Sequence, residues 1–263
     1  MLQDTHLAEN IFSILTLMVI NKIYPLAIYW LRGVFVLVFN IIEDISEVDN
    51  SFFKRRRKRV LQPVRENLRI NNNTYTIVHM NRNNINDYFV KRILMVNRGR
   101  TLKCDYEEIN IYISEYLLDI RPYIKRAILA TLLKEMPYNN SFSSLCIYDD
   151  EFRLSDEYFA IAEKARNLSI IGENKTEIEL FRHKCYHDLG LIVDCSDKYC
   201  ELYHTSLDLN DIMMNKSAFL SIDGCKMLIY ADESYFNVDD NVSQLLKYNV
   251  PIEYACASLY MRL

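Results

Sequence analysis

Four polar residues stand at or near the ends of apolar runs that have the length of buried strands. Asp149 and Asp150 close one run, Asp194 closes another, and Ser221 lies in a third. In open α/β sheets, ligands bind beyond the carboxyl ends of the strands. Carboxylates gathered at such an edge repel one another, so they attract a cation or a basic partner. We therefore take these four residues as the candidate ligand-binding site. A soluble enzyme that acts near Asp149 and Asp194 is one interpretation of it.

The order of these residues resembles that of a response-regulator receiver domain. Asp149 and Asp150 form the acidic pair, Asp194 ends the third strand, Ser221 lies in the next strand, and Lys247 follows. In that family the acids hold magnesium, and the third-strand aspartate accepts phosphate. The chain departs from the family pattern, because it has no Lys-Pro step and no proline-glycine turn after Asp194. A Rossmann-like or flavodoxin-like module without that chemistry is the alternative.

Histidines and cysteines between 183 and 204 could in principle bind zinc, which takes nitrogen and thiolate ligands in a tetrahedral arrangement. His183 and His187 are four residues apart and would share one face of a helix. Cys200 and His204 follow, but they lack the tight C-x-x-C spacing of a zinc knuckle. We therefore expect no metal here, and interpret the histidines as surface residues of a helix.

Glycine and cysteine usage limits the cofactors and the compartment. The five glycines are too far apart for a G-x-G-x-x-G or G-x-x-x-x-G-K phosphate loop. We therefore predict no nucleotide cofactor. The seven cysteines are an odd number, and several lie in apolar contexts typical of reduced, buried thiols. This usage favours a cytoplasmic protein.

The net charge of the chain is -4, but one stretch of it is strongly basic. Residues 54–103 hold 14 Lys and Arg against two acids. Its densest part could bind anionic lipid headgroups or nucleic acid phosphates. The aromatic residues nearby form no RNA-binding pattern, so we do not expect nucleic acid. The residues proposed to bind an anionic surface are Lys54, Arg55, Arg56, Arg57, Lys58 and Arg59.

An almost wholly apolar segment, residues 11–42, precedes this block. About 20 apolar residues can cross a bilayer, and a basic block beyond them marks the cytoplasmic side. The segment could instead supply a buried helix and a buried strand, Gly33 to Ile42, to a folded core. Arg32 counts against a single simple span, since a guanidinium near mid-bilayer costs about 2.5–3.5 kcal/mol.

The remaining pattern predicts an α/β protein in three parts. Residues 1–45 are the apolar segment and the predicted membrane anchor. Residues 46–138 are a basic and then helical α+β region, with Lys54–Arg69 as a basic helix or arm and 92–96 as a strand. Residues 141–263 alternate apolar strands with helices and end in a strand at 250–261, which indicates a doubly wound, Rossmann-like or flavodoxin-like parallel sheet.

These observations predict a membrane-associated cytoplasmic protein at the inner face of the membrane, with a regulatory or scaffolding role in preference to catalysis. It would bind a protein partner or a small ligand. The enzyme near Asp149 and Asp194 is the second interpretation, and a metal- or nucleic-acid-binding module is the third.

Overall fold

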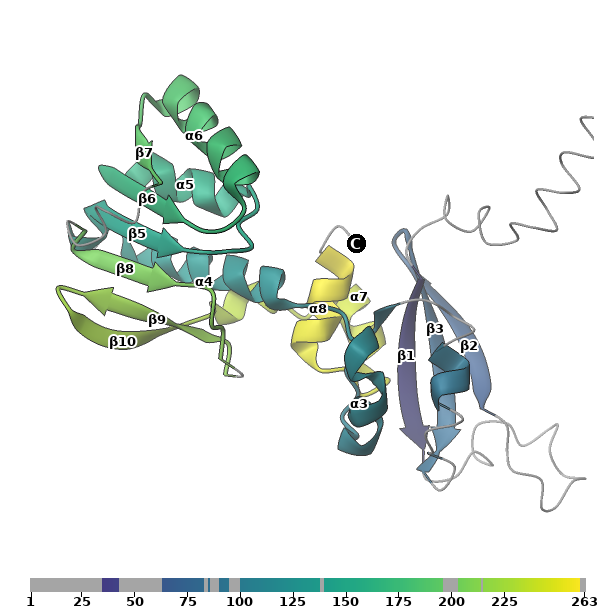
Figure 1. The fold of residues 1–263 in the computed structure, drawn as a ribbon. Coiled ribbons are helices and arrows are strands. Elements are labelled where there is room, and N and C mark those ends of the chain that lie inside the picture. The colour runs from purple at the N-terminus through teal and green to yellow at the C-terminus, as the bar shows by residue number, and fades with distance from the viewer. Residues whose placement is uncertain are drawn as a thin grey trace, which may run out of the picture. The chain divides into compact units, whose positions relative to one another are not determined.

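The computed structural model describes residues 35–42, 63–82, 85, 90–94, 100–137, 140–195, 203–213 and 215–260. They divide into two units (Figure 1). The middle unit is Asp119–Asn237, and the terminal unit combines the chain up to Leu118 with the chain from Val238. This division differs from the predicted boundaries. Residues 119–137 group with the α/β sheet that follows them, and residues 238–260 group with the N-terminal part.

The terminal unit contains a four-stranded sheet in the order β2-β3-β1-β4. Strand β1 (Phe35–Ile42) pairs in parallel along its whole length with β3 (Asn73–Asn81). The short β4 (Arg100–Thr101) is also parallel to β1, and β2 (Val64–Ile70) is antiparallel to β3. The predicted basic helix or arm is therefore wrong at residues 64–69, because they form this edge strand.

Strand β1 belongs to the segment that was predicted to anchor the chain in a membrane. Val36, Leu37, Val38, Phe39 and Ile41 are each at most 4% exposed. A strand paired on both sides and buried on both faces is part of a folded core. For residues 35–42 the anchor prediction is therefore wrong, and the alternative of a buried strand is confirmed. Residues 1–34 lie outside the described part of the chain. Within that part, no helix is long and apolar enough to cross a bilayer.

Helices cover the sheet of the terminal unit. On one face, Leu37, Phe39 and Ile41 pack with a helix at 90–94 and with α3 (Glu107–Ile113), which a 3-10 turn, η3 (Ser114–Tyr116), follows. The strand predicted at 92–96 is thus wrong for residues 92–94. The other face carries Tyr75, whose hydroxyl donates to the backbone oxygen of Ser258 at 3.2 Å.

Ser258 lies in α8 (Ile252–Tyr260), which follows α7 (Asp240–Leu246). The predicted terminal strand at 250–261 is therefore wrong. A short apolar run does not by itself distinguish a buried helix from a buried strand. Pro251 directly precedes the helix, a position that suits proline. The buried residues Ala255, Ala257 and Ser258 are small, which allows the helix to approach the sheet closely.

The middle unit contains a six-stranded sheet in the order β10-β9-β8-β5-β6-β7. The strands β5 (Ser144–Tyr148), β6 (Asn167–Ile171), β7 (Val193–Asp194) and β8 (Thr205–Asp208) are mutually parallel. Strands β9 (Ser217–Ile222) and β10 (Cys225–Tyr230) complete it as an antiparallel hairpin. The predicted α/β class with a mostly parallel sheet is confirmed.

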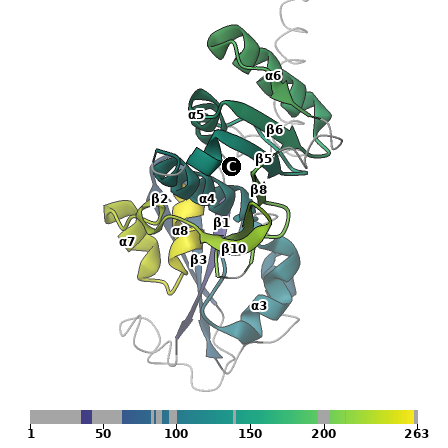
Figure 2. The same cartoon turned by 90° about the vertical axis from the view of Figure 1, so that its left-hand side faces the viewer.

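Three helices pack against this sheet, namely α4 (Arg121–Glu135), α5 (Asp156–Lys164) and α6 (Lys175–Leu189). Figure 2 shows α4 and α5 side by side along the strands. Helix α6 begins after Asn174, whose side chain accepts from the Glu177 N–H, and ends at Gly190 with φ of 67°. Both ends follow from residue type, since Asn caps helix starts and Gly adopts the left-handed conformation at helix ends. Short 3-10 turns, η4 (Asn140–Ser143) and η6 (Glu233–Tyr235), precede β5 and follow β10.

Candidate functional site

The chain reverses direction across the middle sheet between β5 and β8. It runs from β5 outward to β6 and β7, and then returns to β8 on the other side of β5. In open α/β sheets, this topological switch point leaves a crevice beyond the carboxyl ends of the two strands, where ligands bind. The residues at this position are Asp149 and Asp150 after β5, and Asp208 and Asn210 at the end of β8.

Asp149 is the centre of a buried polar cluster at this point, although it directly follows an apolar strand. It is 1% exposed. Its Oδ1 forms an ion pair with Nζ of Lys125, which α4 supplies. Its Oδ2 accepts a hydrogen bond from the hydroxyl of Tyr158 in α5 at 2.7 Å. Each carboxylate oxygen therefore has a donor, as a buried charge requires.

The Tyr158 side chain lies in surroundings of low polarity. It is 3% exposed, and its ring lies 4.6 Å from that of Phe152 between centroids. Burial, followed by the adjacent Asp149 carboxylate, raises the pKa of Tyr158 well above 10. Tyr158 therefore stays protonated and acts as a hydrogen-bond donor to Asp149.

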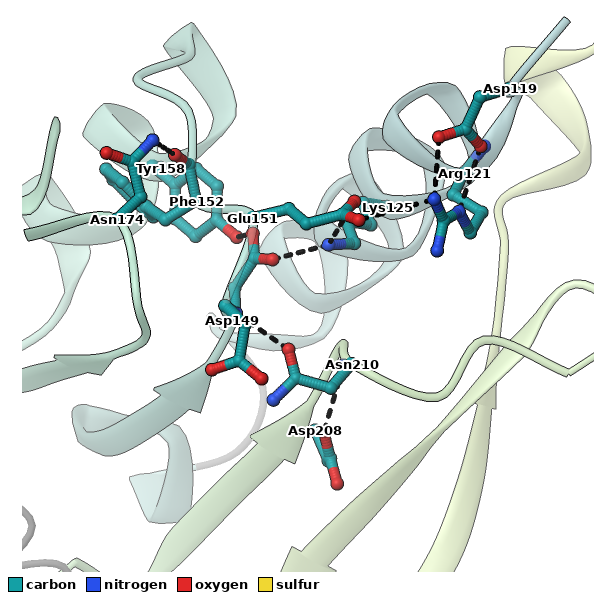
Figure 3. Close-up of polar contacts among 11 residues, drawn as sticks. Asp119, Arg121, Lys125, Asp149, Glu151, Phe152, Tyr158, Asn174, Asp208 and Asn210 are labelled. Carbon is teal, nitrogen blue, oxygen red and sulfur yellow. Dashed lines mark hydrogen bonds and ion pairs between the residues drawn. The ribbon is translucent and has the colours of Figure 1, made fainter.

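A half-exposed layer of charges covers the buried cluster (Figure 3). One Glu151 oxygen lies 3.8 Å from Nζ of Lys125, and the other lies 3.3 Å from the Arg121 guanidinium. Arg121 also binds both oxygens of Asp119 at 2.9 Å. That hydrogen bonding lowers the pKa of Asp119 and raises the pKa of Arg121. Both cations thus have carboxylate partners within the chain.

The backbone around this site is held tightly. The Asp150 N–H donates to Oδ1 of Asn210 at 2.7 Å, which joins the loop after β5 to the loop after β8. The Asn210 N–H in turn donates to Oδ1 of Asp208 at 3.0 Å. Gly172, just beyond β6, lies so close that a Cβ there would be 2.0 Å from the Asp149 carbonyl oxygen. Only glycine fits that approach.

The structure brings Asp149 and Asp150 to the switch point but not Asp194 or Ser221. Asp194 ends β7, two strands away from β5, which is a lateral separation of about 10 Å. Its carboxylate accepts from the adjacent Cys195 N–H at 2.8 Å. Ser221 pairs with Ser206, the second residue of β8, and so lies away from the carboxyl end of that strand, because β9 runs antiparallel. The predicted four-residue cluster is therefore not assembled, and an enzyme site shared by Asp149 and Asp194 has no geometric support.

The resemblance to a receiver domain also fails at the level of the sheet. That site would need Asp194 next to Asp149, but β6 separates their strands. Lys247 follows α7 and belongs to the terminal unit, whereas the acids belong to the middle unit. The order of acids along the sequence thus does not correspond to a shared position in space.

The other predicted sites remain apart or lie outside the described residues. His183 and His187 are exposed on α6, with ring centroids 6.4 Å apart, and His204 bonds to Asp223 Oδ1 at 3.0 Å. Cys200 and the basic block 54–59 are not described. Among the described residues, no three His, Cys, Asp or Glu side chains are grouped so that they could hold a metal ion.

Lys125 and Tyr158 were missed by the sequence analysis, although one of them carries a signal. Lys125 occupies the apolar stripe of its helix, three residues before Ile128 and seven before Leu132. A lysine on a buried helical face needs a buried carboxylate, and Asp149, at the end of the apolar run 145–149, is one candidate in the sequence. Tyr158 carries no such signal, because tyrosine is common on buried faces.

Comparison with known proteins gives no relative: no protein-family model, no curated protein and no solved structure matches this chain.

Proposed function

We propose that this protein is a regulatory or scaffolding protein that binds a ligand at the carboxyl ends of β5 and β8. The observation that carries the proposal is the switch point itself, where the loops after β5 and β8 are joined by the hydrogen bond between Asp150 and Asn210 at 2.7 Å. Such a switch point is the usual ligand position in this class of sheet.

Binding is favoured over catalysis because the buried charges are already paired. Asp149 has a donor on each oxygen, and Lys125 has Asp149 and Glu151 as partners. A general acid or base needs a polar atom that can reach a substrate proton. The cluster instead fixes the loop after β5, and so holds the exposed side chains of Asp150 and Glu151 in place.

The chemistry of the ligand follows from what is exposed. Asp150 and Asp211 are exposed, and the side chain of Glu151 is half-exposed. The nearby cations, Lys125 and Arg121, are neutralised by carboxylates of the chain. The site therefore suits a ligand with a cationic group, such as an amine, and does not suit an anion.

Calorimetric titration of the full-length protein with spermidine tests this proposal. We expect saturable binding that weakens about tenfold, equivalent to about 1.4 kcal/mol, in an Asp150→Asn/Asp211→Asn variant. Glu163→Gln, which changes an exposed carboxylate on α5, is the matched control and should bind like the wild type. Equal affinity of the double variant and this control would contradict the proposal. Magnesium and ATP are titrated in parallel, and turnover of ATP would favour an enzyme instead.

We also propose that the protein is attached to a membrane from the cytoplasmic side. The support is the sequence of residues 11–33, which is mostly apolar, interrupted by Asn21, Lys22 and Arg32, and long enough to reach across a bilayer, together with the basic block 54–59 beyond it. Because β1 begins at Phe35, the proposed attachment ends before the folded core begins.

Membrane fractionation tests the attachment. Full-length protein should sediment with membranes and stay there in high salt, since apolar insertion is not screened. A variant that begins at residue 34 keeps β1 and should be released. A variant with Gln at residues 54–59 should stay attached but lose its dependence on anionic lipid. Full-length protein that stays monodisperse without detergent would contradict the proposal.

A further inference from the structure

Strand β10 is an unprotected edge of the middle sheet. The edge strands among the described residues are β10, β7, β2 and β4. Strands β7 and β4 have two residues each, and β2 carries Arg65, Glu66 and Arg69. Short length and charge are the usual protections against pairing with another chain. Strand β10 has six residues and a single charge, on Lys226.

The hairpin turn determines which backbone groups of β10 face outward. Asp223 and Gly224 both have positive φ, 49° and 82°, as in a two-residue type I′ turn. Such a turn makes Cys225 the hydrogen-bonded partner of Ile222, and every second residue after it bonds to β9. The N–H and C=O groups of Lys226 and Leu228 therefore point away from the sheet.

Hydrogen bonds at the end of β10 confirm this alternation. The Ala231 N–H donates to the Lys216 oxygen at 2.8 Å, toward β9. The Tyr230 oxygen points the other way and accepts from Oγ1 of Thr131 in α4 at 2.7 Å. At the end of the strand, the outward-pointing oxygen of Tyr230 is therefore already hydrogen-bonded to helix α4. Within the described part of the chain, the two outward residues before it have no backbone partner.

The side chains on this edge are apolar and exposed. Met227 is 46% exposed, Leu228 37% and Tyr230 53%, and Phe219 opposite Leu228 on β9 is 40% exposed. The edge therefore combines unpaired backbone groups with apolar side chains, and a strand that pairs with it would satisfy the first and cover the second.

We propose that β10 pairs antiparallel with β10 of a second copy of this chain, so that the two six-stranded sheets become one continuous sheet. The outward-pointing backbone groups of Lys226 and Leu228 define the register in which the two strands pair. Lys226 of one copy lies opposite Leu228 of the other, and these two residues supply all four intermolecular hydrogen bonds. Met227 then faces Met227 of the second copy on the two-fold axis.

This register is compatible with the charges of the strand. Each Lys226 lies opposite an apolar residue and not opposite the other Lys226, so no like charges are paired across the axis. The register also leaves the Tyr230 oxygen with Thr131, and so breaks no hydrogen bond of the monomer. A two-fold axis between the two β10 strands makes the interface self-complementary, as closed dimers require.

Disulfide trapping in the full-length protein tests the register. Opposed residues that do not exchange hydrogen bonds have Cα atoms about 4.5 Å apart, within reach of a disulfide. In a Cys200→Ser/Cys225→Ser background, Met227→Cys should yield a cross-linked dimer on mild oxidation. Phe219, at 40% exposed, is similar to Met227 at 46% but lies one strand further from the axis, so Phe219→Cys should not yield a cross-linked dimer. Equal cross-linking of the two variants, or none in either, would overturn the proposal.

A second variant separates this interface from other modes of association. Leu228→Pro removes an outward N–H that the monomer does not use, and edge strands tolerate proline at such positions. In detergent solution, sedimentation analysis should show a dimer for the wild type and for Leu228→Ala, and a monomer with an unchanged circular dichroism spectrum for Leu228→Pro. A dimer that survives Leu228→Pro would place the interface elsewhere. A wild-type monomer would mean that β10 pairs with a different protein or with none, against the proposal.

Discussion

Substituting Lys125 by methionine isolates the energetic role of the buried cluster. Methionine matches the lysine stem in length but carries no charge. The Asp149 carboxylate would remain 1% exposed with only the Tyr158 hydroxyl as donor. Removing one partner of a buried ion pair typically costs about 3–5 kcal/mol, because the other charge is left uncompensated. We expect that loss in the free energy of unfolding of Lys125→Met.

The same helix supplies a matched control. Lys134 also forms an ion pair, with Asp232, but its side chain is 62% exposed. Exposed pairs contribute about 0–1 kcal/mol, so Lys134→Met should lie close to the wild type. Both variants are compared by urea unfolding followed by circular dichroism.

A third variant tests the reason for the loss. Lys125→Met/Asp149→Asn removes the stranded charge and keeps an oxygen to accept from Tyr158, so it should recover about half of the lost stability. If Lys125→Met costs no more than Lys134→Met, the pair is not buried in solution, and the reasoning about this cluster is refuted.

Three further outcomes follow from the same region. Gly172→Ala should destabilise the protein by about 1–3 kcal/mol or more, since its Cβ would meet the Asp149 carbonyl at 2.0 Å and backbone must move; thermal unfolding measures this, and a neutral effect would contradict the packing. Asn174→Ala should cost about 1 kcal/mol through loss of the α6 cap and of the bond to the Phe152 oxygen at 2.9 Å, with Asn174→Asp, which keeps the cap, less affected. Because burial raises the pKa of Tyr158 well above 10, its contribution is complete below pH of about 10 and is lost as pH rises through the folded-state value. Tyr158→Phe should therefore reduce the alkaline loss of stability, and an unchanged pH profile would exclude this role.

The elements of the middle unit were largely predictable because each has a local cause. The apolar runs at 145–149 and 168–172 correspond to β5 and β6, Gly190 ends α6, and Asp223-Gly224 forms the turn between β9 and β10. These features depend on residues close together in sequence. The strand prediction at 250–261 failed because a short run of small apolar residues suits either structure, and packing against Tyr75 decides between them.

The candidate site was only partly predictable, because strand order is not a local property. Asp149 and Asp194 both end predicted strands, but nothing in either run indicates that β6 lies between them. The pattern of strands could not predict the partner of Asp149 either, because Lys125 lies in a helix 24 residues earlier in the sequence. Which residues form the cluster depends on contacts between different helices and strands. The periodicity of the sequence within one element gives no information about those contacts.

The interleaving of the two units has a consequence for synthesis on the ribosome. Strands β1 and β3 are made early, but the Ser258 oxygen that accepts from Tyr75 is added only near the end of the chain. The middle unit, Asp119–Asn237, is complete before that point. Nascent chains usually fold from the N-terminus onward, whereas here the first strands must wait for the last helix. A chain released from the ribosome after residue 237 would therefore have a finished middle unit and a half-covered N-terminal sheet, the form of this chain most in need of a chaperone.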